Sequence, residues 1–416
     1  MMLRNSSEAR ETLDQAFERL KDLYLTTSVL SVVRTYVSKS IVDMELWTFF
    51  CATVDFQVPV IDRLIPMLRA LLREIEGRGL KFIELVYNLR EAYEILSTFK
   101  WGIGKRGFSH RFIRIEDVLS LFKALQELIE EHSSLGEIAR GLYEDSVARG
   151  DNEPVANVIK GIASEIRNRL PELIGRTKAI IPDPSGNSAM KRMCLFIRWM
   201  VRPYPDLNLW NFINPKHLLV SLDSGIIRTI RRAFNIKLAR QANWKDVIKT
   251  TKLLREINQD DPTKYDYVLS RPSIMGYCTP DPAMNRCYLC PLSNICRSAT
   301  PPPTIKSKPL TSEKERKIFE RFLKIYGNQF DKIATEYPLG SRSADAVAHM
   351  KNCKWCVIEV EEKLNYTAIG QALMYRNLYK EIKKKKPEAL IVCQKADLEL
   401  KNACEIDAGI KVVLVP

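Results

Sequence analysis

The sequence has no apolar run that approaches the length of a membrane-spanning helix. Its first residues, MMLRNSSEARE, lack both the basic start and the apolar stretch of a secretory signal. No internal repeat is visible either, which excludes a repeat architecture. We therefore expect a soluble cytoplasmic protein that has no membrane partner.

The chain is long and rich in basic residues. Its 416 residues, of which 46% are hydrophobic, are enough for two or three domains with cores of their own. The 64 Lys and Arg residues outnumber the 50 Asp and Glu residues and give a formal net charge of +14. Such a charge favours a polyanionic partner, with nucleic acid as the first candidate. A dispersed charge of this kind is also typical of thermophilic protein surfaces.

Four of the ten cysteines lie close together in GYCTPDPAMNRCYLCPLSNICRS, where prolines and asparagines favour loops. Cys278, Cys287, Cys290 and Cys296 have the spacing C-x8-C-x2-C-x5-C. Four thiolates in such loops suit a [4Fe–4S] cluster or a tetrahedral Zn²⁺. Zinc sites usually have two close cysteine pairs, and only one is present here, so an iron–sulfur cluster is favoured. Disulfides are disfavoured because no secretory signal precedes them.

The first part of the chain has the apolar spacing of amphipathic helices, which predicts an all-α domain. Ser109-His110-Arg111-Phe112 precedes one of these helices and is compatible with a phosphate contact or with a loop packed through its aromatic side chains. The expected helices are 9–24, 44–52, 59–76, 81–97, 115–131 and 154–170.

A turn rich in Pro, Gly and Ser, IIPDPSGNSAM, leads directly into a further helix. With Asn187 or Ser188 as the N-cap, Lys191 and Arg192 fall in the first turns, where a helix N-terminus can bind phosphate. A second helix follows Asp223, which is a suitable N-cap for it. This helix carries Arg228, Arg231 and Arg232.

The proline-rich stretch TPPPTIKSKP predicts a linker over residues 300–310. We therefore expect a domain over residues 1–299 and a second over 311–416. In the second, strands near 345–349, 355–361, 389–393 and 410–415 alternate with helices over 312–326 and 367–383, which predicts a small α/β sheet.

The order of these motifs resembles the helix-hairpin-helix DNA glycosylase superfamily with its iron–sulfur loop, as in endonuclease III and the adenine glycosylases. FSHRFIRIEDVLSLFKAL, SGNSAMKRMCLFIRWMVR, LVSLDSGIIRTIRR and LREINQDDPTKYDYVLSR are similar to an uncharacterised branch of it, known as a domain of unknown function. The resemblance covers roughly residues 40–298. The first cysteine interval is two residues longer than in the superfamily, and the usual Pro-Gly-x-Gly hairpin is replaced by PSGNS.

The resemblance implies that Lys191 is an amine nucleophile and that Asp223 is the carboxylate beside it. A buried carboxylate stabilises an oxocarbenium-like transition state, and a lysine with a lowered pKa can attack C1′ and form a Schiff base. Arg192 is a rival register for the lysine position. The cysteine loop would be structural and would hold basic residues against DNA. The expected DNA-binding residues are Arg192, Arg228, Arg231, Arg286 and Arg297.

The second domain resembles the PD-(D/E)xK restriction-endonuclease-like nucleases, in particular the RecB-like branch. Asp345, Glu359 and Glu361 occupy the acidic positions, and Gln371 and Tyr375 form a Q-x3-Y motif on the next helix. The acidic residues would hold Mg²⁺ or Mn²⁺, which activates water against a phosphodiester. Glu361 replaces the family's lysine, and the nearby Lys363 is a substitute candidate.

The second domain has another set of cysteines, Cys353, Cys356, Cys393 and Cys404. These four make a second possible thiol set, although ordinary buried cysteines explain them better.

Together, these features predict a multidomain α and α/β protein that acts in DNA repair, from a thermophilic, archaeal source. The expected activity is that of a base-excision DNA glycosylase/AP lyase on damaged or mismatched bases, with a metal-dependent nuclease domain. One alternative is a structure- or lesion-directed endonuclease in which only the C-terminal domain is catalytic. The other is a non-enzymatic DNA-binding adaptor.

Overall fold

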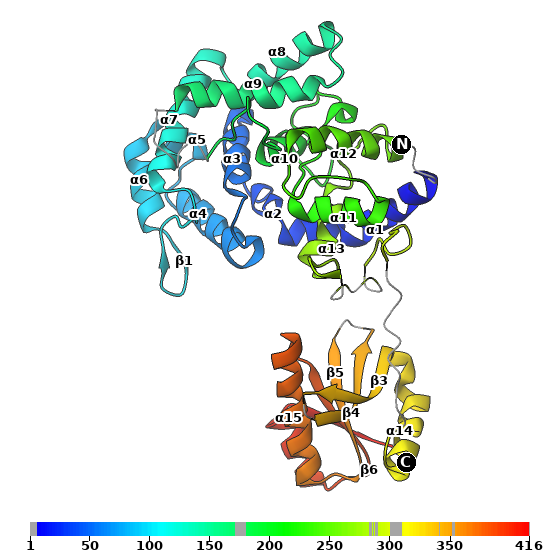
Figure 1. Cartoon of the computed structure of the whole chain (residues 1–416). Helices are drawn as coiled ribbons and strands as arrows, with labels where there is room; N and C mark the ends of the chain where they lie inside the picture. Colours follow the sequence, from blue (N-terminus) through cyan, green and yellow to red (C-terminus); the bar gives the residue numbers. More distant parts are fainter. Residues whose placement is uncertain are drawn as a thin grey trace. The chain divides into compact units, whose positions relative to one another are not determined.

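The computed structural model describes residues 6–170, 180–282, 285, 287, 290–299, 310–340, 342–351 and 354–415. The chain divides into two compact units, residues 1–302 and 303–416, and each is described by itself. Figure 1 shows a helical first unit and a second unit in which helices flank a sheet. Residues 300–309 of the expected linker, Arg286 and Cys353 lie outside the described residues.

Helices dominate the first unit. Ser40, Ser134 and Asn243 begin three of them by accepting a backbone N–H three residues further on. The helices are α1 (Ser6–Thr27), α2 (Leu30–Val33), α3 (Ile41–Val54), α4 (Ile65–Gly77), α5 (Phe82–Tyr87), α6 (Leu89–Thr98), α7 (Ile115–His132), α8 (Leu135–Ala148), α9 (Pro154–Arg169), α10 (Lys191–Val201), α11 (Ser224–Phe234), α12 (Trp244–Ile257) and α13 (Asp266–Ile274).

The expected helices of this unit are present, and two of them differ in detail. The helix expected over 81–97 is two helices, because Asn88 caps α6 and accepts the N–H of Glu91. The segment 59–76 begins with a π-helical turn, Val60–Leu64. The sequence reading missed α2, α8, α12 and α13, and a small hairpin of β1 (Lys100–Gly102) and β2 (Lys105–Arg106) makes the all-α expectation incomplete.

Helix α3 is buried on nearly every side within the first unit and is mostly apolar, although it also buries Asp43 and Glu45. Phe49 and Phe50 are completely buried, and Phe196 of α10 meets the ring of Phe49 edge-on, with the ring centroids 5.0 Å apart. This packing brings the end of α3, at Asp55, beside the start of α10, at Lys191.

The second unit contains a five-stranded sheet in the order β3-β4-β5-β6-β7. The first three strands are antiparallel, and the last three are parallel. The strands are β3 (Phe330–Leu339), β4 (Arg342–Met350), β5 (Trp355–Lys363), β6 (Glu388–Lys395) and β7 (Ile410–Leu414), and the helices are α14 (Glu313–Tyr326), α15 (Tyr366–Lys383) and α16 (Leu398–Ile406).

Helices α14 and α15 cover opposite faces of this sheet, each with its own core (Figure 1). Val357 belongs to the core under α15 and Ile358 to the core under α14, as the alternation of a strand requires. The expected mixture of a helical part and a C-terminal α/β part is confirmed, but the sequence reading missed β3 and α16. No described helix combines the length and the apolar character needed to cross a membrane.

Candidate functional site

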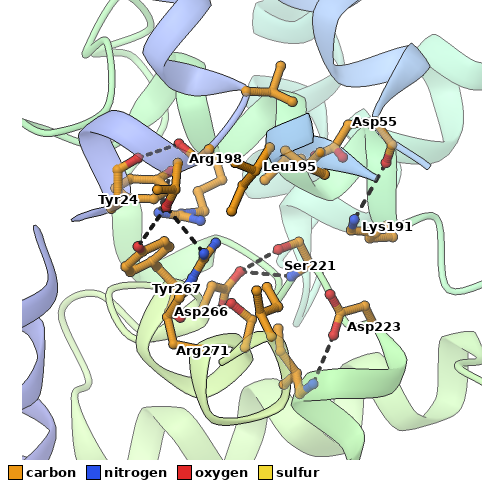
Figure 2. A pocket seen from close by; sticks show the side chains of 18 of the residues that line it. Tyr24, Asp55, Lys191, Leu195, Arg198, Ser221, Asp223, Asp266, Tyr267 and Arg271 are labelled. Carbon is orange, nitrogen blue, oxygen red and sulfur yellow. Dashed lines mark hydrogen bonds between the residues drawn. The ribbon is translucent and has the colours of Figure 1, made fainter. Parts of the chain in front are cut away.

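A cavity of about 360 Å³ opens among the helices of the first unit (Figure 2). Side chains from α1, from the segment after α3, from α10, from the turn before α11, and from α13 line it. Lys191 and Asp223 are both in this lining, and so is Asp55. Lys191 and Asp223, the two catalytic residues that the glycosylase resemblance implies, therefore share one cavity.

Lys191 is the first residue of α10, and its side chain is half-buried. Its Nζ lies 3.5 Å from the backbone oxygen of Asp55. The N-cap of α10 is Met190, in the left-handed conformation at φ 51°, so the expected cap at Asn187 or Ser188 is wrong. Ser188 acts one step earlier, because its Oγ accepts the N–H of Met190 at 3.2 Å and tightens the turn.

The pKa of Lys191 does not follow the sequence-based expectation. Burial acts to lower it, but the carboxylates of Asp55 and Asp223 favour the charged form, and the net pKa is raised above the ordinary value. The expected lowering of this pKa is therefore wrong. Lys191 carries a proton at neutral pH and must give it up before its nitrogen can act as a nucleophile.

Asp223 is the N-cap of α11 and also belongs to the cavity wall. Its Oδ1 accepts the N–H of Ile226 at 2.8 Å, which leaves Oδ2 outside the cap bond. The two interpretations that the sequence left open for Asp223, helix cap and site carboxylate, are therefore compatible.

Asp55 is a third charged residue of this wall, and the sequence reading missed it. It follows the last residue of α3, where the carbonyl end of the helix dipole disfavours a negative charge. An acidic residue directly after the apolar run LWTFFCATV is the only signal for it in the sequence. Its half-buried side chain lies close enough to Lys191 to raise the pKa of that amine.

The basic residues expected to bind DNA fall into two groups. Arg231 and Arg297 are exposed. Arg192 is half-buried and donates to the backbone oxygens of Thr53 and Ile180 at 3.0 and 2.7 Å, so it holds α10 to its surroundings.

Arg228, also half-buried, braces the cysteine loop. It donates to Ser273 Oγ and to the backbone oxygen of Cys278, both at 3.0 Å.

The loop around His110 is a packed element. The Nε2 of His110 lies 3.0 Å from the backbone oxygen of Phe56, and its Nδ1 accepts the N–H groups of Phe112 and Ile113. The rings of Phe56 and His110 lie with their centroids 4.8 Å apart. Of the two interpretations of this segment, the packed loop is the one that these contacts favour.

The four cysteines of the loop meet at one place. Cys278, Cys287, Cys290 and Cys296 line a single cavity of about 20 Å³, and all four are free thiols. Arg232 closes one side, with its Nη1 3.1 Å from Cys278 Sγ. Burial is the main cause that raises the pKa of Cys290 to about 12, and the other three sulfurs add to it.

The cavity of about 360 Å³ and the cysteine cavity are lined by the same two helices. Helix α11 contributes Asp223 to the larger cavity and Arg232 to the cysteine cavity. Helix α13 does the same with Arg271 and Pro272. Helices α11 and α13 therefore take part in the lining of both cavities.

The second unit brings its acidic residues together on β4 and β5. Ala346 pairs with Ile358, which places Asp345 beside Glu359 on the neighbouring strand. The Oδ2 of Asp345 accepts the N–H of Val360 at 2.7 Å. Glu359 is 4% exposed, and its Oε2 has no hydrogen-bond partner among the described residues.

Crowding of carboxylates changes the acidity of this cluster. Burial, opposed by the hydrogen bond from Val360, raises the pKa of Asp345 to about 7. Burial and then the charges of Asp345 and Glu361 raise the pKa of Glu359 to about 9. The pKa of Glu361 itself is raised by burial.

The other residues of the nuclease motif divide around this cluster. Tyr375 is close enough to Glu359 and Gln371 for both to affect its pKa, which burial raises. Lys363, at the end of β5, is exposed. Tyr375 of the Q-x3-Y motif therefore lies near the carboxylates of Glu359 and Asp345.

The three described cysteines of the second unit do not form one set. Cys356 is in the core under α14, whereas Cys393 and Cys404 are in the core under α15. Buried structural cysteines, which the sequence favoured here, agree with this placement.

Neither the thiols nor the carboxylates form a ready site for one ion. Within the described ranges, no group of three or more His, Cys, Asp or Glu side chains is arranged to hold a single metal ion. A cubane cluster differs from a single ion because each of its four irons binds a different thiolate. The four thiols line one small cavity without gathering around one point.

Residues 30–275 match a family described as a protein of unknown function (DUF2400). This match spans more than half of the 416 residues. The chain belongs to the DUF2400 family. The matched segment contains Asp55, Lys191, Asp223 and Asp266 and ends before the first cysteine of the loop, Cys278.

One curated relative shares a short segment with this DUF2400 chain. Deoxyribonuclease-1 of Ovis aries is 38% identical over 65 residues, which are 16% of this chain and 25% of the relative. The match thus spans about a quarter of that relative's length. No solved structure matches the chain.

Proposed function

We propose that this DUF2400 protein is a DNA repair enzyme of the helix-hairpin-helix type, a base-excision DNA glycosylase/AP lyase that acts on damaged or mismatched bases. The observation that carries the proposal is the placement of Lys191 and Asp223 in the wall of one cavity of about 360 Å³. A cavity of this size holds a single flipped base and its sugar. We expect the protein to act on chromosomal DNA in the cytoplasm.

In the proposed reaction, the Asp223 carboxylate and the Lys191 amine have different roles. As the bond between C1′ and the base breaks, the base leaves with the electron pair, and the Asp223 carboxylate stabilises the positive charge that develops on the sugar. Lys191 transfers its proton to a neighbouring carboxylate or to the departing base, and its nitrogen then bonds to C1′. The raised pKa of Lys191 makes this proton transfer a necessary step.

Charge outside the cavity supports a DNA substrate. The chain carries a formal net charge of +14, and Arg231 of α11 and Arg297 of the cysteine loop are both exposed. The cysteine loop contacts α11 through its backbone. In that contact, the N–H of Arg297 donates to the backbone oxygen of Ala233 at 3.1 Å. Exposed guanidinium groups held on rigid backbone suit phosphate binding.

We further propose that Cys278, Cys287, Cys290 and Cys296 hold one [4Fe–4S] cluster with a structural role. Their placement around one cavity, as free thiols, supports this assignment over disulfides. When bound, such a cluster cross-links the loop through four thiolates. The loop's own backbone, tied to Arg232 and Arg228, would then hold α11 and α13 in place.

A structure- or lesion-directed endonuclease is the second candidate, with the second unit as the catalyst. The observation that favours it is the buried Oε2 of Glu359, which has no partner among the described residues and lies among acidic neighbours. Mg²⁺ or Mn²⁺ would supply the missing partner and activate water. Since the side chains as they lie are not grouped around one ion, we derive no cleavage step from them. A DNA-binding adaptor without catalysis is the remaining alternative.

A panel of lesion-bearing duplexes, incubated with the full-length protein in EDTA, Mg²⁺ or Mn²⁺, separates the three candidates. Base release in EDTA supports the glycosylase. Incision that requires the metal and survives Lys191→Ala supports the endonuclease. Binding without base release or incision under any condition leaves the adaptor.

A further inference from the structure

The inner wall of the larger cavity contains polar atoms that no protein group uses. Among the described residues, three buried atoms of this wall have no hydrogen-bond partner: Arg198 Nε, Asp266 Oδ1 and Arg271 Nε. The last two belong to α13. Buried polar groups in native proteins are almost always paired, so unpaired ones gathered in one cavity wall point to a ligand.

Asp266 is held rigidly with one oxygen free. It is 2% exposed, and its Oδ2 accepts the N–H and the Oγ–H of Ser221 at 2.9 and 2.7 Å (Figure 2). Burial is the main cause that raises its pKa to about 6. Above that pH the carboxylate is ionised, and Oδ1 is an acceptor without a donor.

Arg271 is a donor held in a fixed plane. It is 7% exposed, and its guanidinium lies 4.0 Å from the ring centroid of Tyr267. Its Nη1 donates to Thr27 Oγ1 at 3.3 Å. No ion pair with a carboxylate forms at Arg271 within the described part of the chain, whereas Arg198 in the same wall is matched by Asp206 at 3.3 Å.

An acceptor and a donor in the wall of one cavity, beside an aromatic ring, are complementary to the edge of a flat heterocycle. A ring N–H next to a carbonyl oxygen, the lactam edge of hypoxanthine, guanine and uracil, offers one donor and one acceptor. A lactam N–H is more acidic than an exocyclic amine and therefore bonds more strongly to a carboxylate, and a carbonyl oxygen accepts well from a guanidinium.

We propose that Asp266 and Arg271 recognise the lactam edge of the base that enters the cavity, with Asp266 Oδ1 accepting the ring N–H and Arg271 donating to the carbonyl oxygen. This inference rests on the proposed glycosylase function, because it assigns the substrate class of the same cavity. Purine and pyrimidine lactams share this edge, and experiment distinguishes them.

Equilibrium dialysis of the full-length protein at pH 8 tests the edge directly. The probes are the 2′-deoxynucleosides of hypoxanthine, 1-methylhypoxanthine, uracil, 3-methyluracil and adenine, in which the sugar occupies the ring nitrogen that would otherwise offer a second N–H. Each N-methyl base retains the carbonyl oxygen and loses the ring N–H. We expect hypoxanthine, uracil or both to bind about tenfold more tightly than the methylated partner and than adenine, since losing the donor leaves Asp266 unpaired.

Asp266→Asn is the matched variant. Its amide oxygen can keep both Ser221 bonds, and its NH₂ group then replaces the free acceptor, so the preference for the N–H base should fall to within about twofold. Asp260→Asn, an exposed acid in the segment before α13, is the control and should retain the wild-type preference. If Asp266→Asn does not fold, the methylated bases still test the wild-type protein.

Borohydride trapping on a duplex with an abasic site is run beside the dialysis, because it needs Lys191 and no base. Trapping together with equal binding of the methylated and unmethylated bases overturns the lactam assignment and leaves the proposed function intact. Lactam preference without trapping supports the recognition site and removes the lyase. Adenine binding as tight as that of hypoxanthine also overturns the lactam assignment.

Discussion

Asp223 and Arg232 connect the two cavities of the helical unit through one helix. Asp223 caps the first turn of α11, where its Oδ1 accepts the N–H of Ile226 at 2.8 Å. Arg232, in the last turn, donates to Cys278 Sγ at 3.1 Å. Because both residues are held by one short helix, we expect a change at the cysteine loop to shift the carboxylate of the proposed catalytic site.

This connection predicts a combined effect of a cysteine substitution. Cys290→Ser should lower the iron content from about four per chain to near zero, remove the absorbance near 400 nm that such clusters show, and weaken binding to an abasic duplex by about tenfold. Iron analysis of anaerobically purified protein and fluorescence anisotropy measure these effects. Cys404→Ser, in the other unit, is the control. Stoichiometric zinc without iron in the wild type would reject the cluster.

Asp223→Asn separates the two roles of this residue. Asn is as good an N-cap as Asp, so Tm should change by less than about 2 °C. The negative charge that stabilises the developing oxocarbenium ion is lost, so single-turnover base excision should slow by about 100-fold or more. A normal excision rate in this variant would leave Asp223 as a helix cap only.

The raised pKa values in the second unit predict that its stability depends on pH. Asp345 and Glu359 have folded-state pKa values of about 7 and about 9, above their ordinary values. In their protonated form these two groups do not destabilise the folded state, and this holds fully at about pH 4. As the pH rises through the folded-state pKa values, the buried carboxyl groups ionise, and the free energy of unfolding falls because burial disfavours the charged form.

Glu359→Gln should remove the larger part of this dependence. We expect the Tm of the second unit's transition, followed by calorimetry of the full chain, to exceed the wild-type value by about 4 °C or more at pH 9, and to match it at pH 4. Glu381→Gln, an exposed glutamate on α15, should follow the wild type at both values. Equal Tm values for Glu359→Gln and the wild type at pH 9 would show that Glu359 does not titrate as its burial indicates.

The same carboxylates test the endonuclease alternative. If Asp345, Glu359 and Glu361 bind Mn²⁺, the ion should raise the wild-type Tm at pH 8, and Asp345→Ala should weaken Mn²⁺ binding and metal-dependent nicking together. Isothermal titration and a nicking assay on supercoiled DNA measure the two. No Mn²⁺ uptake, with incision unchanged in Asp345→Ala, would leave a nuclease-like fold without nuclease activity.

Local signals in the sequence were sufficient for parts of the site. The turn before Lys191 and the capping residue Asp223 are readable because a helix start depends on a few neighbouring residues. The pairing of Glu359 with Glu361 on one strand face follows from the period of a strand. The loop context of the cysteines likewise predicted that they would lie together.

Other parts depend on contacts that one sequence does not reveal. Asp55 and Asp266 share the cavity only because the end of α3, α10 and α13 pack together, and neither sequence neighbourhood predicts that packing. The pKa of Lys191 was misjudged for the same reason, since its direction depends on Asp55. Strand β3 was missed because FDKIATEYPL lies at an edge of the sheet and mixes charged with apolar residues.

Borohydride trapping with peptide mapping tests the central claim most directly. The full-length protein is incubated with a duplex that contains one abasic site, the imine is reduced, and the peptide that carries the DNA is identified by mass spectrometry. The account predicts a covalent adduct on Lys191 that Lys191→Ala abolishes, while binding to the same duplex persists. No adduct, or one that maps to another lysine and survives Lys191→Ala, would contradict it.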